Sequence, residues 1–360
     1  MAKSRKIWLI VAVVLMLLVC IVLGAVMAEA QWNFDSLLTD RYQTNEHKIS
    51  NSFSSIVIVT DTANIVFLPS DDTECSVVCY EQANQRHSVA LKDGALVIEV
   101  NDQRKWYEYI GIHFHAPELT VYLPRGEYGA LAIKSDTGDV EIPDAFGFES
   151  VDISGDTGNV TVCASTSGKM KIKTSTGGIR VENASVGVLA LSASTGGVAV
   201  SNVTCEGDVS ITVSTGKTSL LNVACQDLTS VGDTGDISLK GVIASGALSI
   251  ERSTGKTSLL NVVCQDLTSV GDTGDISLKG VIASGALSIE RSTGDVRFEG
   301  ADAAEIFVTT DTGDVKGTLL SEKIFVVKTD TGRIDVPKSV TGDRCEITTD
   351  TGDIKITIVE

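Results

Sequence analysis

The stretch Leu131-Ala132-Ile133-Lys134-Ser135-Asp136-Thr137-Gly138-Asp139-Val140 contains the unit from which most of this sequence is built. Its Thr-Gly pair recurs in twelve regularly spaced copies, and the eleven intervals between their glycines are all 19 or 20 residues. The glycines are Gly138, Gly158, Gly177, Gly196, Gly216, Gly235, Gly255, Gly274, Gly294, Gly313, Gly332 and Gly352. A fixed period of this length is typical of solenoids, in which each repeat is one supersecondary unit.

Apolar residues flank the turns at a spacing of two. Counted from each glycine, positions −7, −5, +2 and +4 are mostly apolar, as in Leu131/Ile133 and Val140/Ile142. This alternation predicts a half-buried strand on each side of the turn, followed by a more variable second turn. Two short strands cannot form a core alone, so we predict an all-β fold, a parallel β-solenoid of ~20-residue circuits. The polar exceptions are Thr218, Thr257, Ser230 and Ser269, and Gly317 also breaks the pattern.

Two circuits have been copied almost unchanged. Residues 215–253 recur as 254–292, and the two copies differ only by Ala224 against Val263. A solenoid tolerates such a change in length because every circuit contacts only its neighbours. The duplication therefore favours a spacer or display rod over an enzyme with one fixed catalytic site.

The composition narrows the classes of partner. The chain of 360 residues has 29 Lys+Arg and 47 Asp+Glu, a formal net charge of −18. Phosphate binding needs a basic surface, so we expect no nucleic acid partner. Seven cysteines follow residue 28 without a Cys-x-x-Cys or a Cys/His zinc spacing, and we interpret most of them as small buried apolar residues.

The N-terminus predicts an anchor. Residues 1–6 contain three cations, and residues 7–28 carry no charge over about 33 Å of helix, enough to span a membrane. The positive-inside rule then predicts a cytoplasmic tail at 1–6, a single transmembrane helix at 7–28 and an extracytoplasmic body. The alternative is a signal peptide cleaved near Ala30, with a secreted body, because Ala28-Glu29-Ala30 has the form of a cleavage site.

The body divides into three parts. Residues 29–52 are polar and predict a juxtamembrane linker. Residues 53–130 are rich in strand patterns but irregular, and Asp61-Thr62-Ala63 resembles a degenerate copy of the turn, so we expect a cap and the first circuits here. Residues 131–360 are the regular solenoid with its twelve Thr-Gly turns.

The run Leu119-Thr120-Val121-Tyr122-Leu123-Pro124, followed by residues 131–140, resembles the bacterial putative-adhesin family of β-strand-repeat proteins. The similarity covers about residues 50–360. It implies a surface-exposed or membrane-tethered β-solenoid with a domain of unassigned function. The family supplies no catalytic residues to carry over.

Aspartates line the turns. The Asp-Thr-Gly triplet also occurs in aspartic proteases, but those enzymes need two such loops facing each other across one cleft, whereas here the triplet recurs along one edge. Stacked carboxylates about 4.8 Å apart repel unless a cation shares them, and Ca²⁺ accepts six to eight oxygens. The sequence suggests either solvated turn acids or a weak Ca²⁺ ladder where the acids are densest, at Asp311, Asp314, Asp330, Asp350 and Asp353.

Aromatic residues gather in one short stretch. Trp106, Tyr107, Tyr109 and Phe114 lie within nine residues of a chain that is 5% aromatic. They predict either a contact for a protein or glycan ligand or a plug that covers the first circuit. In the same stretch His113 and His115 share one strand face, but a metal site would need a third ligand.

Together these patterns predict a non-enzymatic extracytoplasmic surface protein, an adhesin-like rod that binds or displays and is tethered to the membrane. The alternative is a cell-envelope sensor or scaffold that acts through protein contacts of the cap or the C-terminal edge. The final strand of the sequence, 352–360, has no polar cap after it, so we expect an open edge there. We expect no cofactor other than weakly bound Ca²⁺, and the sequence leaves the oligomeric state open.

Overall fold

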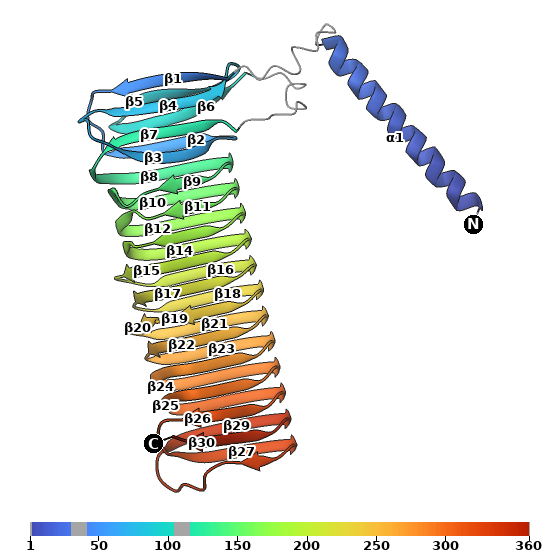
Figure 1. Ribbon diagram of the computed structural model, residues 1–360, viewed down its shortest axis with the longest axis vertical. Coiled ribbons are helices and arrows are strands. Elements are labelled where there is room, and N and C mark those ends of the chain that lie inside the picture. Colours follow the sequence, from blue (N-terminus) through green and yellow to red (C-terminus); the bar gives the residue numbers. More distant parts are fainter. Residues whose placement is uncertain (1, 30–41, 104–115, 360) are drawn as a thin grey trace.

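The computed structural model describes residues 2–29, 42–103 and 116–359, and within these ranges the chain forms one helix and thirty strands (Figure 1). The strands stack into a long parallel β-solenoid, which confirms the predicted fold class. Each of the twelve regularly spaced Thr-Gly pairs lies at the turn between two strands of one circuit, as predicted from the period.

The strands that enter the Thr-Gly turns pair in parallel with their counterparts in neighbouring circuits, as Val151 does with Leu131 and Met170. We call this array the pre-turn ladder. In spatial order it contains β2 (Ser55–Thr60), β8 (Gly126–Thr137), β10 (Phe146–Thr157), β12 (Ser165–Thr176), β14 (Ser185–Thr195), β16 (Val209–Thr215), β18 (Leu228–Thr234), β21 (Ala247–Thr254), β23 (Asp266–Thr273), the second halves of β24 (Ile276–Thr293) and β25 (Val296–Thr312), β29 (Asp343–Thr351) and β27 (Lys323–Thr331).

The strands that leave the turns form a second array, the post-turn ladder. It contains β3 (Asn64–Ser70), β9 (Val140–Ile142), β11 (Val160–Val162), β13 (Ile179–Glu182), β15 (Val198–Cys205), β17 (Thr218–Cys225), β19 (Ile237–Lys240) with β20 (Ile243–Ala244), β22 (Thr257–Cys264), the first halves of β24 and β25, β26 (Val315–Leu319), β30 (Ile354–Ile358) and β28 (Ile334–Asp335). A third, shorter run also pairs between circuits, as at Ser185 and Thr204. The second turn is therefore more regular than its sequence suggests.

The apolar columns fill the space between the ladders. Leu131, Ile133, Val140 and Ile142 are each at most 3% exposed, as the alternation predicts. Ten of the twelve Thr-Gly glycines have φ between 132° and 159°, a region that favours glycine. Space also excludes a side chain, because a Cβ on Gly177 would lie 2.0 Å from the carbonyl oxygen of the glycine one circuit before it.

Five further strands build the cap: β1 (Tyr42–Ile49), β4 (Cys75–Gln82), β5 (Gln85–Lys92), β6 (Ala95–Asp102) and β7 (Glu118–Pro124). β6 and β5 extend the pre-turn ladder beyond β2, whereas β7, β4 and β1 extend the post-turn ladder beyond β3. β4 and β5 run antiparallel to their partners, so the cap departs from solenoid topology. The prediction that 29–52 is entirely linker is wrong, because residues 42–49 form β1 along the whole length of β4.

Two arginines are buried inside the duplicated circuits. Arg252 and Arg291 are each only 3% exposed. Arg252 donates hydrogen bonds to the carbonyl oxygen of Val213 (3.0 Å) and to Thr218 Oγ1 (3.2 Å). Arg291 donates to Ser269 Oγ (2.7 Å). Two of the polar exceptions in the apolar columns, Thr218 and Ser269, thus serve as acceptors for buried guanidinium groups.

Gly232 makes room for one of these arginines. A Cβ at this position would lie 2.0 Å from the Val213 carbonyl oxygen and 2.3 Å from Nη1 of Arg252. We expect Gly232→Ala to lower the free energy of unfolding by about 1–3 kcal/mol, the usual cost of overpacking. Gly155 occupies the same position in another circuit, where a Cβ would meet nothing closer than 3.8 Å, so Gly155→Ala should be nearly neutral. Urea unfolding of both variants measures the difference, and equal losses would contradict it.

The C-terminal circuits do not stack in chain order. β29 pairs with β25 on one side and β27 on the other, and β30 lies between β26 and β28 (Figure 1). The last circuit of the sequence is therefore inserted between the two circuits that precede it. Our prediction of an open edge at 352–360 is wrong, because the outermost circuit among the described residues is β27–β28. Pro337 follows β28 and lacks an amide proton, which suits an outer edge. Burial agrees with this order, because Ile354 and Ile356 are buried whereas Ile334 in the outer circuit is exposed.

The N-terminal apolar run lies in α1 (Ala2–Glu29). Within the residues described in full, which in this helix are 11–22, 24, 25 and 28, no helix is long and apolar enough to cross a membrane. The structure thus does not support the transmembrane span that we predicted for 7–28, which rests on the sequence alone.

Candidate functional site

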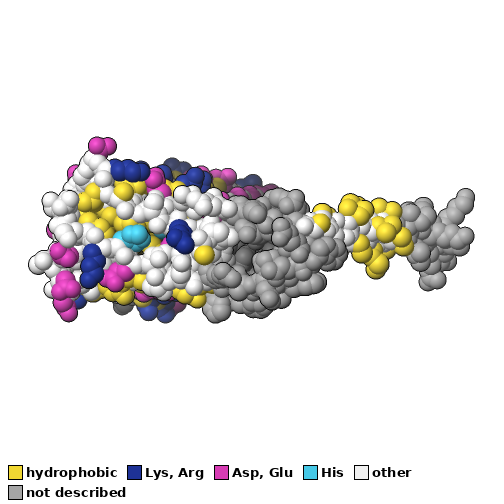
Figure 2. Space-filling view, turned by 90° about the horizontal axis from the view of Figure 1, so that it is seen from above, with side chains coloured by type: hydrophobic (Ala, Val, Ile, Leu, Met, Phe, Trp, Pro, Cys, Tyr) yellow, Lys and Arg dark blue, Asp and Glu magenta, His cyan; other side chains and the backbone are white. Residues whose placement is uncertain are grey.

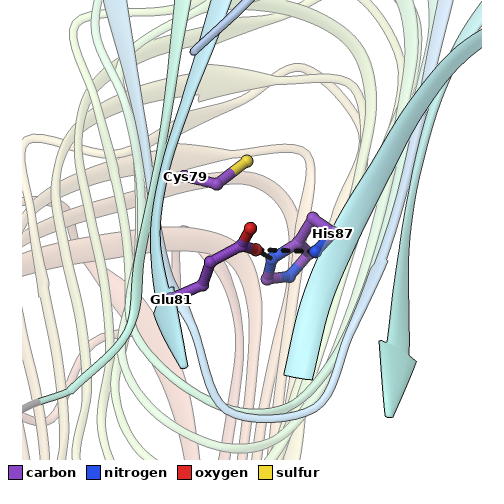
Figure 3. A group of neighbouring side chains, drawn as sticks. All are labelled: Cys79, Glu81 and His87. Carbon is purple, nitrogen blue, oxygen red and sulfur yellow. Dashed lines mark hydrogen bonds and ion pairs between the residues drawn. The ribbon is translucent and has the colours of Figure 1, made fainter. Parts of the chain in front are cut away.

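A cluster of three chemically active side chains lies inside the cap. Cys79 and Glu81 stand two residues apart on β4 and so point to the same side of that strand, while His87 comes from β5. Their ligand atoms all lie within 4.8 Å of one another, and all three residues are buried (Figure 3). The residues between β4 and β5 are only Ala83 and Asn84, yet β5 pairs with β6 and not with β4. The cluster therefore joins the two ladders across the interior of the cap.

Hydrogen bonds fix the cluster. Glu81 Oε2 accepts from the His87 backbone amide at 2.6 Å and lies 2.8 Å from His87 Nδ1. The other carboxylate oxygen accepts from Asn45 Nδ2 at 2.6 Å, and His87 Nε2 lies 2.8 Å from Thr60 Oγ1. Asn45 belongs to β1 and Thr60 to β2, so four strands contribute to one polar network.

The electrostatics separate the carboxylate from the thiol. Burial opposes ionisation of Glu81, but the hydrogen bonds from His87 and Asn45 outweigh it and lower the pKa of this carboxyl group. Burial and the nearby Glu81 charge raise the pKa of Cys79 to about 12. The thiol is therefore protonated at neutral pH. A catalytic cysteine must be ionised and must be accessible to solvent and substrate, whereas the Cys79 thiol is protonated and buried. Its donors instead suit a structural ion pair or a metal ion.

The predicted Ca²⁺ ladder has another arrangement. Among the described residues, the cap cluster is the only group of three or more His, Cys, Asp or Glu ligands within 4.8 Å of one another, so the five aspartates do not gather in this way. Asp314 Oδ1 accepts from the Asp353 amide (2.7 Å), and Asp353 Oδ1 accepts from the Arg333 amide (2.9 Å). Acids at this turn position thus bind the backbone of the next circuit. Lys328 pairs with Asp330 (3.0 Å). Calcium binding by Asp311, Asp314, Asp330, Asp350 and Asp353 stays a prediction.

The other predicted site residues lie outside the described part of the chain. Trp106, Tyr107, Tyr109 and Phe114 all fall between 104 and 115, as do His113 and His115. The cap cluster was missed in the sequence because a turn separates His87 from Cys79 and Glu81, and the strands on the two sides of that turn do not pair with each other. The Cys-x-Glu spacing and the nearby histidine were the available signal.

The chain belongs to the Toastrack DUF4097 family, a domain of unknown function, whose sequence profile matches residues 53–216 and 211–360. This confirms the family resemblance that residues 119–124 and 131–140 indicated. No curated protein shows significant similarity to the chain.

Solved structures with a similar fold include proteins named as adhesins. A putative adhesin from Parabacteroides distasonis is 13% identical, with a TM-score of 0.38, over 88% of this chain and 99% of that chain. A putative adhesin from Parabacteroides merdae is 11% identical (TM-score 0.34), over 89% and 98% of the two chains. A putative lipid binding protein from Parabacteroides distasonis is also 11% identical (TM-score 0.29; 88% and 97%). Similarities of this size concern the general fold and do not identify a ligand.

Proposed function

We propose that the chain is a non-enzymatic surface protein whose solenoid is a rod that binds a ligand or displays a binding surface. The observation that carries this proposal is the self-contained stacking of the circuits. Turn acids accept hydrogen bonds from the next circuit, as Asn159 N donates to Asp139 Oδ1 at 2.7 Å, and the interior columns are apolar and buried. Such a structure can change in length while its surface chemistry stays the same. The copied pair of circuits is an insertion of this kind.

An extracytoplasmic location and an N-terminal anchor belong to this proposal. They rest on the apolar run at 7–28 and on the three cations before it. A second candidate is a scaffold that binds a protein partner through the cap. Its support is the cap end of the molecule, where hydrophobic side chains reach the surface between acidic and basic ones (Figure 2).

Removal of residues 254–292 tests the rod. This deletion joins Ser253 to Thr293 and so recreates the junction that Ser292 makes in the intact chain. We expect a folded protein with a closely similar melting temperature that is shorter by two circuits, about 9.6 Å at 4.8 Å each. Circular dichroism and small-angle scattering measure both properties. A variant that fails to fold would contradict the self-contained stacking.

The surface location needs a separate measurement. An epitope inserted beside Val340, which is 89% exposed, should be labelled by antibody on intact cells that produce the full chain. The deletion variant carrying the same epitope should be labelled equally, because only its reach differs. Labelling that appears only after the cells are opened would overturn the surface proposal.

A further inference from the structure

The cap cluster contains the three ligand types that zinc uses most. Zn²⁺ takes cysteine sulfur, histidine nitrogen and carboxylate oxygen as ligands. Cys79, Glu81 and His87 supply one of each, with their ligand atoms within 4.8 Å of one another and at most 7% of any residue exposed. In Figure 3 the three side chains converge from two strands on one point between them.

The surroundings have the form of an outer ligand shell. A histidine that binds a metal usually engages its second ring nitrogen with a hydrogen-bonding partner, and a carboxylate ligand is usually held by a further donor. His87 Nε2 lies 2.8 Å from Thr60 Oγ1, and Asn45 Nδ2 donates to Glu81 Oε1 at 2.6 Å. Both interactions leave Nδ1 of His87 and Oε2 of Glu81 directed at each other and toward Cys79.

We propose that Cys79, Glu81 and His87 bind one divalent ion of the zinc class inside the cap, with the ion in place of the proton shared by His87 Nδ1 and Glu81 Oε2. Binding requires the Cys79 thiolate and an unprotonated Nδ1 on His87. The thiol proton is released to solvent, and the proton on Nδ1 moves to Nε2, which faces Thr60 Oγ1. The thiolate and the Glu81 carboxylate then balance the two positive charges of the ion. Three protein ligands leave one coordination position of a tetrahedral site for a water molecule.

The ion would fasten the cap. Cys79 and Glu81 belong to the extension of the post-turn ladder and His87 to that of the pre-turn ladder, so one ion joins the two ladders at the end where the circuits begin. Because ligand binding to the folded state adds to its stability, the metal-loaded cap should resist unfolding more than the metal-free cap.

The test is a zinc titration of the purified full chain after removal of metal by a chelator, in competition with a chromophoric chelator. We expect one equivalent of tight binding, and Co²⁺ should give the near-ultraviolet absorption of a cobalt–thiolate bond. Cys79→Ser should abolish the cobalt–thiolate band and weaken Zn²⁺ binding by more than the roughly 10–100-fold that loss of an outer-shell partner costs.

Two further variants keep the test decisive. Cys75→Ser is the matched control, since Cys75 is buried on the same face of β4 but lies outside the cluster, and it should leave both signals unchanged. Thr60→Val keeps all three ligands and should weaken binding by about 10–100-fold. The proposal fails if the wild-type chain binds no zinc, if Cys79→Ser binds it as tightly as the wild type, or if Cys75→Ser alone loses the cobalt band.

Discussion

Replacement of Glu81 by glutamine is expected to lower the free energy of unfolding of the cap by about 1–3 kcal/mol, the usual cost of leaving a buried donor without its acceptor. Glu81 is 1% exposed and is held by His87 and Asn45 through hydrogen bonds of 2.6–2.8 Å. The amide of Glu81→Gln keeps the size of the side chain but offers one acceptor oxygen in place of two, so either Asn45 or His87 loses its acceptor. Hydrogen exchange of the β4 and β5 amides in metal-free protein reports this loss locally, since solenoids need not unfold in one step.

The same interaction predicts an acid-sensitive cap. The pKa of Glu81 is lower in the folded protein than its ordinary value of 4.5. At pH values near 4.5 this carboxyl group therefore binds fewer protons in the folded protein than in the unfolded chain. The stabilisation is therefore complete above that pH and is lost as the pH falls through the lowered folded-state pKa. Protection of β4 and β5 should decrease over this acidic range in the wild type and change less in Glu81→Gln.

Glu99 provides the matched control for this substitution. It lies in the same cap, on β6, and forms an exposed ion pair with Lys92 at 3.0 Å. Exposed pairs contribute about 0–1 kcal/mol, so Glu99→Gln should have little effect on hydrogen exchange. If the two substitutions proved equally mild, the buried network would not be what holds β4 to β5.

The regular circuits could be predicted because their period is local. Each turn and each apolar column repeats within 20 residues, and stacking repeated units is the one arrangement that buries all the columns at once. The cap could not be predicted in this way. β4 pairs antiparallel with β1 and β7, which are distant from it in sequence, whereas β5 pairs with β6 in a hairpin on the other ladder, and no repeat reports that topology.

Polar residues inside the columns were noticed but not explained by the sequence. Thr218 and Ser269 interrupt the apolar pattern because they accept hydrogen bonds from Arg252 and Arg291, whose side chains run along the interior. Both arginines stand at position −3 from their glycines, in phase with the buried positions −7 and −5, but the apolar pattern in the sequence did not include this position. The glycine one circuit earlier, such as Gly232, was the remaining sign that a large side chain needed its space.

The candidate site shows the same limit. A ligand set is readable from sequence when its members share one strand or one repeat, as the turn aspartates do. Cys79 and Glu81 meet that condition, but His87 reaches them only because β5 joins the opposite ladder. The order of the last circuits was also hidden, since β27 and β29 carry similar patterns and only Pro337 distinguishes their positions.

Deletion of residues 343–360 is expected to remove more structure than the 18 residues it takes away. In the described part of the chain β27 pairs only with β29, and β28 only with β30. Without the inserted circuit, β27 and β28 lose every ladder hydrogen bond, and β25 and β26 become the new edge. We expect amides 323–331 to lose their protection from hydrogen exchange, whereas circuits before β23 should keep theirs because each contacts only its neighbours.

The deletion of 254–292 is the control, because it removes 39 residues and two circuits yet leaves the order β25–β29–β27 intact. Amides 323–331 should stay protected in that variant. The contrast separates chain length from position. The larger deletion removes a copied unit between equivalent neighbours, whereas the smaller one removes the only strands that pair with β27 and β28 in the described part of the chain. If amides 323–331 stayed protected after deletion of residues 343–360, β27 would have moved onto β25, and the two C-terminal circuits would be interchangeable.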